Sequence, residues 1–208
     1  MIQKTPVRKT LHRPENKEHI MELFQNSQAA YRVYADGSCD NKGNGGWAAI
    51  IVSEDRSIEL SGSVMNTSNN RMELTAVLEG LAALPDSAQD ITVISDSQYV
   101  VTGAVFASWW RDHDWQSRRG GKVRYIEMWQ RFLALVSGNR LVRTLWCKGH
   151  AGIVLNELCD KLAKKERDKL IMTGKCSSTR RTVPGSGISK VRTVILSGAG
   201  MPAAIAGL

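Results

Sequence analysis

Apolar residues along this chain follow two spacings, one typical of strands and the other of helices. Short apolar runs that end in polar turn residues predict strands at residues 31–35, 47–52, 57–65, 91–94 and 141–147. Apolar residues three or four apart predict helices, most clearly at Leu74, Val77, Leu78 and Leu81. The predicted helices span residues 71–84, 98–106, 126–136 and 155–170. The order of the elements indicates an α/β fold whose first three strands form an antiparallel meander.

The two ends of the chain differ in composition from this α/β region. Residues 1–30 are polar and basic, with at most a short amphipathic helix from Glu15 to Phe24. From Thr173 onward Ser, Gly, Thr and Arg dominate without periodicity, which is typical of a disordered tail. We therefore predict one folded domain at 31–170, a basic, poorly ordered N-terminal extension at 1–30, and a basic, disordered C-terminal tail at 171–208.

Charge and cysteine content narrow the functional classes. The 208 residues carry a net charge of +8, which favours a polyanionic partner. One stretch without an acid is either a solvated loop or a phosphate-contacting surface, and it contains Arg118, Arg119, Lys122 and Arg124. The four cysteines form no C-x-x-C pair, and no apolar stretch is long enough to span a membrane. We expect free thiols, no membrane partner and a cytoplasmic location.

Four acids lie where acidic side chains are costly. Asp36 and Asp96 each end a predicted strand, Glu73 lies beside the buried face of a helix, and Asp160 shares a helix face with Asn156. Each also has a structural alternative: a turn for Asp36, helix capping for Glu73 or Asp96, and a solvated helix surface for Asp160. If the four converge, they cannot all stay ionised without a cation. Oxygen ligands of this kind favour Mg²⁺, and no Cys/His spacing suggests zinc.

Five motifs follow one another in an order typical of one enzyme family. They are Asp36-Gly37-Ser38-Cys39 with Gly45-Gly46-Trp47, Asn69-Asn70-Arg71-Met72-Glu73-Leu74, Ser95-Asp96-Ser97-Gln98-Tyr99, Trp146-Cys147-Lys148-Gly149-His150-Ala151-Gly152, and Asn156-Glu157-Leu158-Cys159-Asp160. From about Tyr31 to Lys169 the chain resembles type I ribonuclease H of the bacterial kind. The resemblance implies a ribonuclease H-like fold, with a five-stranded mixed sheet flanked by helices. It also implies four catalytic, metal-binding carboxylates and a catalytic loop histidine, namely Asp36, Glu73, Asp96, Asp160 and His150.

The resemblance further implies hydrolysis of the RNA strand of RNA/DNA hybrids by two Mg²⁺ ions, leaving a 3′-hydroxyl and a 5′-phosphate, with Mn²⁺ as an alternative ion. The hybrid is the expected partner of a monomer that needs no small-molecule cofactor. Polar, aromatic and basic residues near the motifs are the expected substrate contacts. They are Cys39, Asn41, Asn44, Ser68, Asn69, Asn70, Gln98, Trp110, Trp115, Arg118, Arg119, Lys122, Arg124 and Asn156. Asn41 and Asn44 are alternatives for one role, because their glycine loop is about one residue shorter than usual.

Two rival functions remain open at this point. A transposase, integrase or junction resolvase of the same fold would use similar acids on DNA, although the Asn69-Asn70 pair and the string at Lys148–His150 favour ribonuclease H. A hybrid-binding module that lost catalysis would keep the fold, yet here all four acids are present. Digestion of RNA/DNA hybrid beside duplex DNA and duplex RNA discriminates among these functions. Of the tryptophans, we expect Trp129 and Trp146 to pack in the core.

Overall fold

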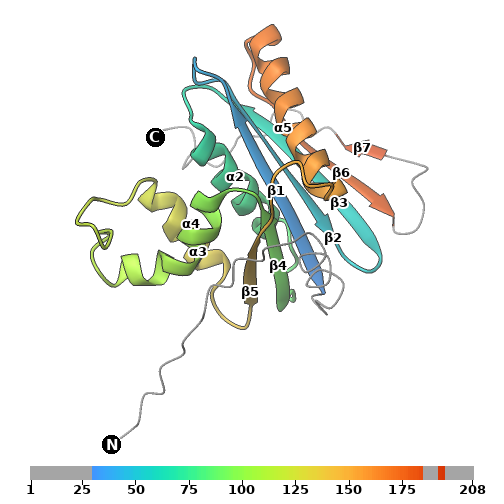
Figure 1. Ribbon diagram of the computed structural model, residues 1–208. Coiled ribbons are helices and arrows are strands. Elements are labelled where there is room, and N and C mark those ends of the chain that lie inside the picture. The colour runs from blue at the N-terminus through green and yellow to red at the C-terminus, as the bar shows by residue number, and fades with distance from the viewer. Residues whose placement is uncertain (1–29, 185–191, 195–208) are drawn as a thin grey trace, which may run out of the picture.

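The computed structural model describes residues 30–184 and 192–194, which form one mixed sheet with helices on both faces (Figure 1). The strands are β1 (Tyr31–Cys39), β2 (Gly45–Val52), β3 (Arg56–Val64), β4 (Asp90–Ser95), β5 (Leu141–Trp146), β6 (Ser178–Pro184) and β7 (Arg192–Val194). The helices are α2 (Asn69–Ala82), α3 (Gln98–Arg111), α4 (Ile126–Leu135) and α5 (Val154–Thr173). The five strands and four helices predicted from the apolar pattern are all present, which confirms the α/β class.

Neighbouring strands of the sheet lie in the order β5-β4-β1-β2-β3-β6-β7. The strands β1, β2 and β3 form the predicted antiparallel meander, whereas β4 runs parallel to β1 and β5 runs parallel to β4. In the parallel pair, Tyr34 of β1 lies opposite Ile94 of β4. Asp36 and Asp96 each follow this pair by two residues, so the register alone brings the two acids side by side.

Both faces of β1 and β2 are covered by helices. Val33, Ala35 and Ile51 belong to the larger core, which they form with residues of α2, α3 and α4. Tyr34 and Ile50 point to the opposite face and pack in a smaller core with α5. Because these central strands are buried on two sides, their sequences read as continuous apolar runs rather than as a strict alternation.

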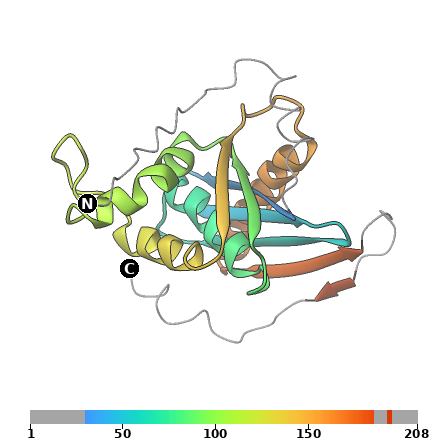
Figure 2. The same cartoon turned by 90° about the horizontal axis from the view of Figure 1, so that it is seen from below.

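The C-terminal segment departs from the prediction. Ser178–Pro184 forms β6, which pairs antiparallel with β3 from Ser178 opposite Gly62 to Pro184 opposite Arg56 (Figure 2). The prediction of a disordered tail is therefore wrong for this segment, and the described sheet has seven strands rather than the predicted five. The Thr and Arg residues of β6 carry no apolar alternation, since a strand near the edge of a sheet has little core to face.

A buried acid anchors the connection between α5 and β6. The Glu166 carboxylate accepts hydrogen bonds from the Ser177 hydroxyl and, at 3.5 Å, from the Ser61 hydroxyl. The Ser177 amide in turn donates to the Ser63 hydroxyl at 3.0 Å. These bonds compensate Glu166 for its burial and tie the C-terminal segment to β3.

Several predictions concern regions outside the sheet. The amphipathic helix expected at residues 15–24 lies outside the described residues, as do residues 195–208. Within the described chain, none of the helices combines the length and apolar character that a membrane crossing requires. The four cysteines are free thiols, as predicted. Trp129 of α4 is fully buried against α3, also as predicted, whereas Trp146 is only half-buried.

Candidate active site

Three of the predicted acids converge from three separate elements. Asp36 comes from β1, Glu73 from the second turn of α2, and Asp96 from the end of β4. One carboxylate oxygen of each lies within 4.8 Å of one from each of the other two. We call Asp36, Glu73 and Asp96 the acidic trio. Such spacing allows one cation to contact oxygens from all three residues.

Close packing of α2 against β1 brings Glu73 to the trio. A Cβ atom added at Gly37 would lie 2.3 Å from the Glu73 amide nitrogen, so only glycine permits this approach of helix and strand. The Gly37 amide also donates to Asp36 Oδ1 at 2.7 Å. Ser68 is the N-cap of α2, and its hydroxyl accepts from the Arg71 amide at 3.4 Å.

Burial makes ionisation of the acidic trio unfavourable. Burial, followed by the charge of Asp96, raises the pKa of Asp36 to about 7. Burial and the neighbouring Asp36 raise the pKa of Glu73 well above its ordinary value, and burial also raises that of Asp96. Glu73 Oε1 accepts from Asn69 at 3.1 Å, but Glu73 Oε2 is buried and has no hydrogen-bond partner among the described residues.

The donor set fits a hard divalent cation. All the converging ligand atoms are carboxylate oxygens, which Mg²⁺ and Mn²⁺ prefer. A bound cation would give the orphaned Glu73 Oε2 an electrostatic partner and would restore the ionised form of each acid. The chemistry of the site therefore agrees with the predicted metal.

Asp160 lies beside the acidic trio but is not one of its members. Its Oδ2 atom accepts from Lys164 at 2.8 Å, one turn further along α5. The charge of Asp160 nevertheless raises the pKa values of both Asp36 and Asp96, so the fourth acid is close enough to act on the same site.

Three neighbours fix Asp96, and the sequence identified only one of them as a site residue. The side chain of Asn156, only 3% exposed, donates a hydrogen bond to the Asp96 carboxylate. Trp146 Nε1 donates to the Asp96 carbonyl oxygen at 3.0 Å. A Cβ atom at Gly149 would lie 2.6 Å from Asp96 Oδ2, so the loop after β5 packs directly against the carboxylate. Asn156, which we predicted to contact substrate, is thus buried against Asp96, a candidate catalytic residue.

His150 occupies the exposed side of the same loop. Its backbone adopts a φ of 54°, in the left-handed region that non-glycine residues rarely enter. The charge of His150 offsets a small part of the rise in the pKa of Asp96, so the imidazole is within electrostatic reach of the acids. The sequence placed His150 in a glycine-bounded loop, and the structure brings that loop to the acidic trio.

The expected polar contacts lie around the trio in different environments. Asn69 and Gln98 are exposed at the first positions of α2 and α3, and Asn70 follows half-buried. Ser68 shares a 2.6 Å hydrogen bond with the Tyr125 hydroxyl, a partner that the sequence analysis did not find.

The glycine loop after β1 carries the other polar candidates. Asn44 Nδ2 donates to Asp40 Oδ2 at 2.8 Å, whereas Asn41 is exposed. The Cys39 thiol is half-buried and donates to the Thr67 carbonyl oxygen at 3.6 Å. Of the two alternative asparagines, Asn41 is therefore the more accessible.

The predicted basic stretch belongs to a loop between α3 and α4 that projects from the body in both views (Figures 1 and 2). We call residues 112–125 the basic loop, and its cations are all exposed, namely Arg118, Arg119, Lys122 and Arg124. The guanidinium group of Arg118 lies 5.0 Å from the Phe106 ring centroid and 5.5 Å from that of Trp109.

The tryptophans near the basic loop differ in their surroundings. Trp110 packs edge-on against buried Trp129, with ring centroids 5.5 Å apart, and Trp115 is half-buried against the same core. Trp109 instead stacks on His113 at 3.9 Å beside Arg118. Trp109, which we did not single out, is thus the tryptophan placed next to the loop cations.

A mixed sheet of this topology with an acidic, metal-competent cluster defines a class of nucleases, and comparison with known proteins identifies the family. The RNase H family model matches residues 28–168. The chain therefore belongs to the RNase H family of hydrolases.

Relatives in bacteria agree with this assignment. The chain is 42% identical over 154 residues to the Ribonuclease H of Methylorubrum extorquens (strain PA1), a match that covers 73% of this chain and 66% of that protein. It is 38% identical over 141 residues to the Ribonuclease H of Neorickettsia sennetsu, a match that covers 65% of this chain and 91% of that protein. Among solved structures, LC9-RNase H1, a type 1 RNase H with the type 2 active-site motif, matches with a TM-score of 0.58 and 27% identity, covering 68% of this chain and 73% of that one.

Proposed function

We propose that this chain hydrolyses the RNA strand of RNA/DNA hybrids and leaves 5′-phosphate and 3′-hydroxyl ends. The observation that carries the proposal is the convergence of three carboxylates, two of them buried and one half-buried, on a fold of the RNase H family. One of the buried carboxylates, that of Glu73, has an orphaned oxygen. A foamy viral protease-reverse transcriptase of the same fold, at 17% identity and a TM-score of 0.57, has been solved in complex with an RNA/DNA hybrid. Hybrid binding is therefore compatible with this architecture.

The four acids would hold two Mg²⁺ ions, with Mn²⁺ as the alternative. When bound, such ions activate water and neutralise charge on the leaving oxygen. Asp36, Glu73 and Asp96 supply converging oxygens whose ionisation is unfavourable without a cation. Asn156 and Trp146 hold Asp96 in position through its carboxylate and its carbonyl oxygen. The exposed imidazole of His150 can accept or supply a proton at the edge of the site.

Selection of the hybrid would use two kinds of contact. Exposed or half-buried polar groups beside the trio, at Asn69, Asn70 and Gln98, suit the 2′-hydroxyls of an RNA strand. The cations of the basic loop suit the phosphates of the DNA strand. We further propose that the protein acts as a monomer in the cytoplasm, where its four free thiols stay reduced.

The test compares cleavage of labelled RNA/DNA hybrid, duplex DNA and duplex RNA, with Mg²⁺, Mn²⁺ or a chelator. We expect cleavage of the hybrid alone, only with a divalent ion. Asp36→Asn and Asp96→Asn should each lower the rate more than about 100-fold, because losing groups that merely orient metal ligands already costs about 10–100-fold. Asp86→Asn, at an exposed acid outside the site, is the matched control. Rates within tenfold of wild type for either site variant would overturn the assignment, and cleavage of duplex DNA would favour the transposase-like rival.

A further inference from the structure

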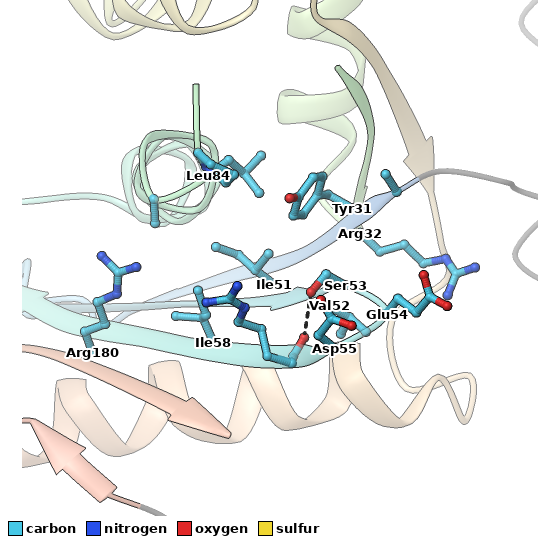
Figure 3. Close-up of a pocket in the computed structure, with 14 residues that line it drawn as sticks. Tyr31, Arg32, Ile51, Val52, Ser53, Glu54, Asp55, Ile58, Leu84 and Arg180 are labelled. Atoms are coloured by element: carbon cyan, nitrogen blue, oxygen red, sulfur yellow. Dashed lines mark hydrogen bonds between the residues drawn. The ribbon is translucent and has the colours of Figure 1, made fainter. Parts of the chain in front are cut away.

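A pocket of about 840 Å³ lies far from the acidic trio, within the ~300–1,000 Å³ range of ligand sites (Figure 3). Ile51 and Ile58 on the sheet, Leu84 after α2, and Tyr31 at the start of β1 line it. Asp36 follows Tyr31 by five residues of extended strand, which spans about 17 Å. The pocket is therefore not part of the candidate active site.

Two cations without ion-pair partners border this pocket. Arg56 begins β3 and Arg180 lies in β6, and both are exposed. Neither guanidinium group forms an ion pair with another residue of the described chain. Figure 3 shows Arg180 at one end of the pocket, far from Glu54 at the other. The Arg180 end of the pocket therefore favours an occupant that carries negative charge as well as apolar side chains.

A segment with both acidic and apolar side chains lies close to the pocket along the chain. Ala30, the first described residue, is one of the lining residues. Residues 15–24 lie outside the described residues and are joined to Ala30 by residues 25–29 alone. A five-residue spacer reaches at most about 17 Å. The tether therefore keeps the segment at an effective concentration on the order of millimolar near the pocket.

The sequence of this segment matches the pocket in both apolar and charged groups. Ile20, Leu23 and Phe24 have the i, i+3, i+4 spacing of one helix face. Three glutamates and one lysine give residues 15–24 a net charge of −2, the three acids being Glu15, Glu18 and Glu22. This acidic stretch stands out in an otherwise basic N-terminal extension, so its charge complements Arg56 and Arg180.

We propose that residues 15–24 of this same chain dock in the pocket, with Ile20, Leu23 and Phe24 against Ile58 and Leu84. Their glutamates then face Arg56 and Arg180. Docking covers the end of the sheet opposite the acidic trio and removes three large apolar side chains from water, which favours the docked state. The proposal does not depend on the proposed nuclease function.

Methyl-labelled NMR of the full-length chain tests this directly. We expect nuclear Overhauser contacts from the Phe24 ring to the Ile58 and Leu84 methyl groups. The double substitution Leu23→Ser with Phe24→Ser should abolish the contacts and shift the Ile51, Ile58 and Leu84 methyl resonances. Leu11→Ser, which makes the same kind of apolar-to-polar change upstream of the segment, is the control and should leave these resonances in place. Arg180→Glu should weaken the contacts without touching the apolar lining.

The outcomes separate the possible occupants. Methyl resonances that are identical in wild type and the double variant overturn the proposal. Resonances that move with protein concentration would show that a second copy fills the pocket instead, which also overturns it. The rate of hybrid cleavage should be the same in wild type and the double variant, so a loss of docking is distinguishable from a failure of the proposed function.

Discussion

Asp36 is the residue at which ligand chemistry and stability conflict most directly. It lies within β1, opposite Ala48 of β2, and is only 5% exposed. A strand buried on both faces normally carries an apolar residue at such a position. The carboxylate is kept there at the expense of ionisation, as the pKa of about 7 shows. A pKa raised by burial in this way is typical of functional positions.

Asp36→Asn should therefore stabilise the metal-free protein, and more at pH 8 than at pH 5. Because folding raises the pKa of Asp36 from 3.8 to about 7, wild-type stability falls as pH rises through this range. Asparagine does not titrate, so its advantage is complete only above pH 7 and is on the order of 4 kcal/mol. Urea unfolding with a chelator at both pH values measures it. An equal gain at both pH values, or a loss at pH 8, contradicts the argument.

His150 should contribute less to catalysis than the acids. Replacing it removes a group that transfers protons, a role worth about 100-fold or somewhat more. His150→Asn is the informative change, because asparagine tolerates the φ of 54° that alanine does not. We expect the maximal rate to fall by about 100-fold while metal-dependent cleavage stays measurable. Complete loss of activity, or a rate equal to that of wild type, would show that the imidazole has a different role.

At the scale of elements, the basic loop is the part of the molecule best placed to extend substrate contact. It connects α3 to α4 and carries four exposed cations with no acid between Trp115 and Ile126. Its base is fixed by the Ser68–Tyr125 hydrogen bond, which links it to the start of α2. The loop is thus positioned relative to the helix that carries Glu73.

Neutralising the loop should weaken substrate binding rather than chemistry. Changing Arg118, Arg119, Lys122 and Arg124 to Gln should raise KM for long hybrids with little change in kcat, since phosphate contacts bind ground and transition states alike. If about three contacts are lost, the logarithmic salt dependence of binding should flatten by roughly two to three.

The control for this variant removes the same charge elsewhere. Lys4, Arg8, Lys9 and Arg13 can be changed to Gln together, which also removes four positive charges. The salt dependence should change less in this control. Equal changes in both variants would show that net charge, not the basic loop, attracts the substrate, and an unchanged slope in the loop variant would make the loop a solvated surface.

At the scale of the whole molecule, β6 and the Glu166 network make the C-terminal segment part of the folded unit. The seven residues of β6 pair with β3, which would otherwise be the edge of the sheet. Glu166 is buried and depends on Ser177 and Ser61 for its hydrogen bonds. The domain boundary expected near residue 170 therefore cuts through a packed region.

Ending the chain after Gly174 should destabilise it, because β3 becomes an open edge and Glu166 loses its Ser177 partner. We expect a loss of about 2–4 kcal/mol, which lowers Tm by about 5–15 °C in a chain of this size. Thermal unfolding followed by circular dichroism measures it. A chain ending after Val194, which keeps β6 and β7, is the control. Equal Tm values for the two truncations would mean that β6 adds no stability.

The sequence by itself determined the order of the central elements and the identity of the acids. Burial on one or two faces leaves a period in the sequence, so the five core strands and four helices could be predicted from apolar spacing. Asp36 and Asp96 could be singled out because an acid directly after a run of apolar residues needs a reason, although Asp36 lies within β1 rather than after it. The motif order then indicated the family, which the comparisons confirm.

Only the tertiary structure decided which groups meet. The strand β6 left no trace in the apolar pattern because its Thr and Arg residues face little core. Asn156 and Trp146 were assigned to substrate and to packing, yet both hold Asp96, because hydrogen-bond partners distant in sequence depend on how the elements pack. Asp160 likewise lies outside the acidic trio, and its carboxylate is paired with Lys164. Local sequence patterns show which residues are buried. Which side chains meet across the fold depends instead on how the elements pack in three dimensions.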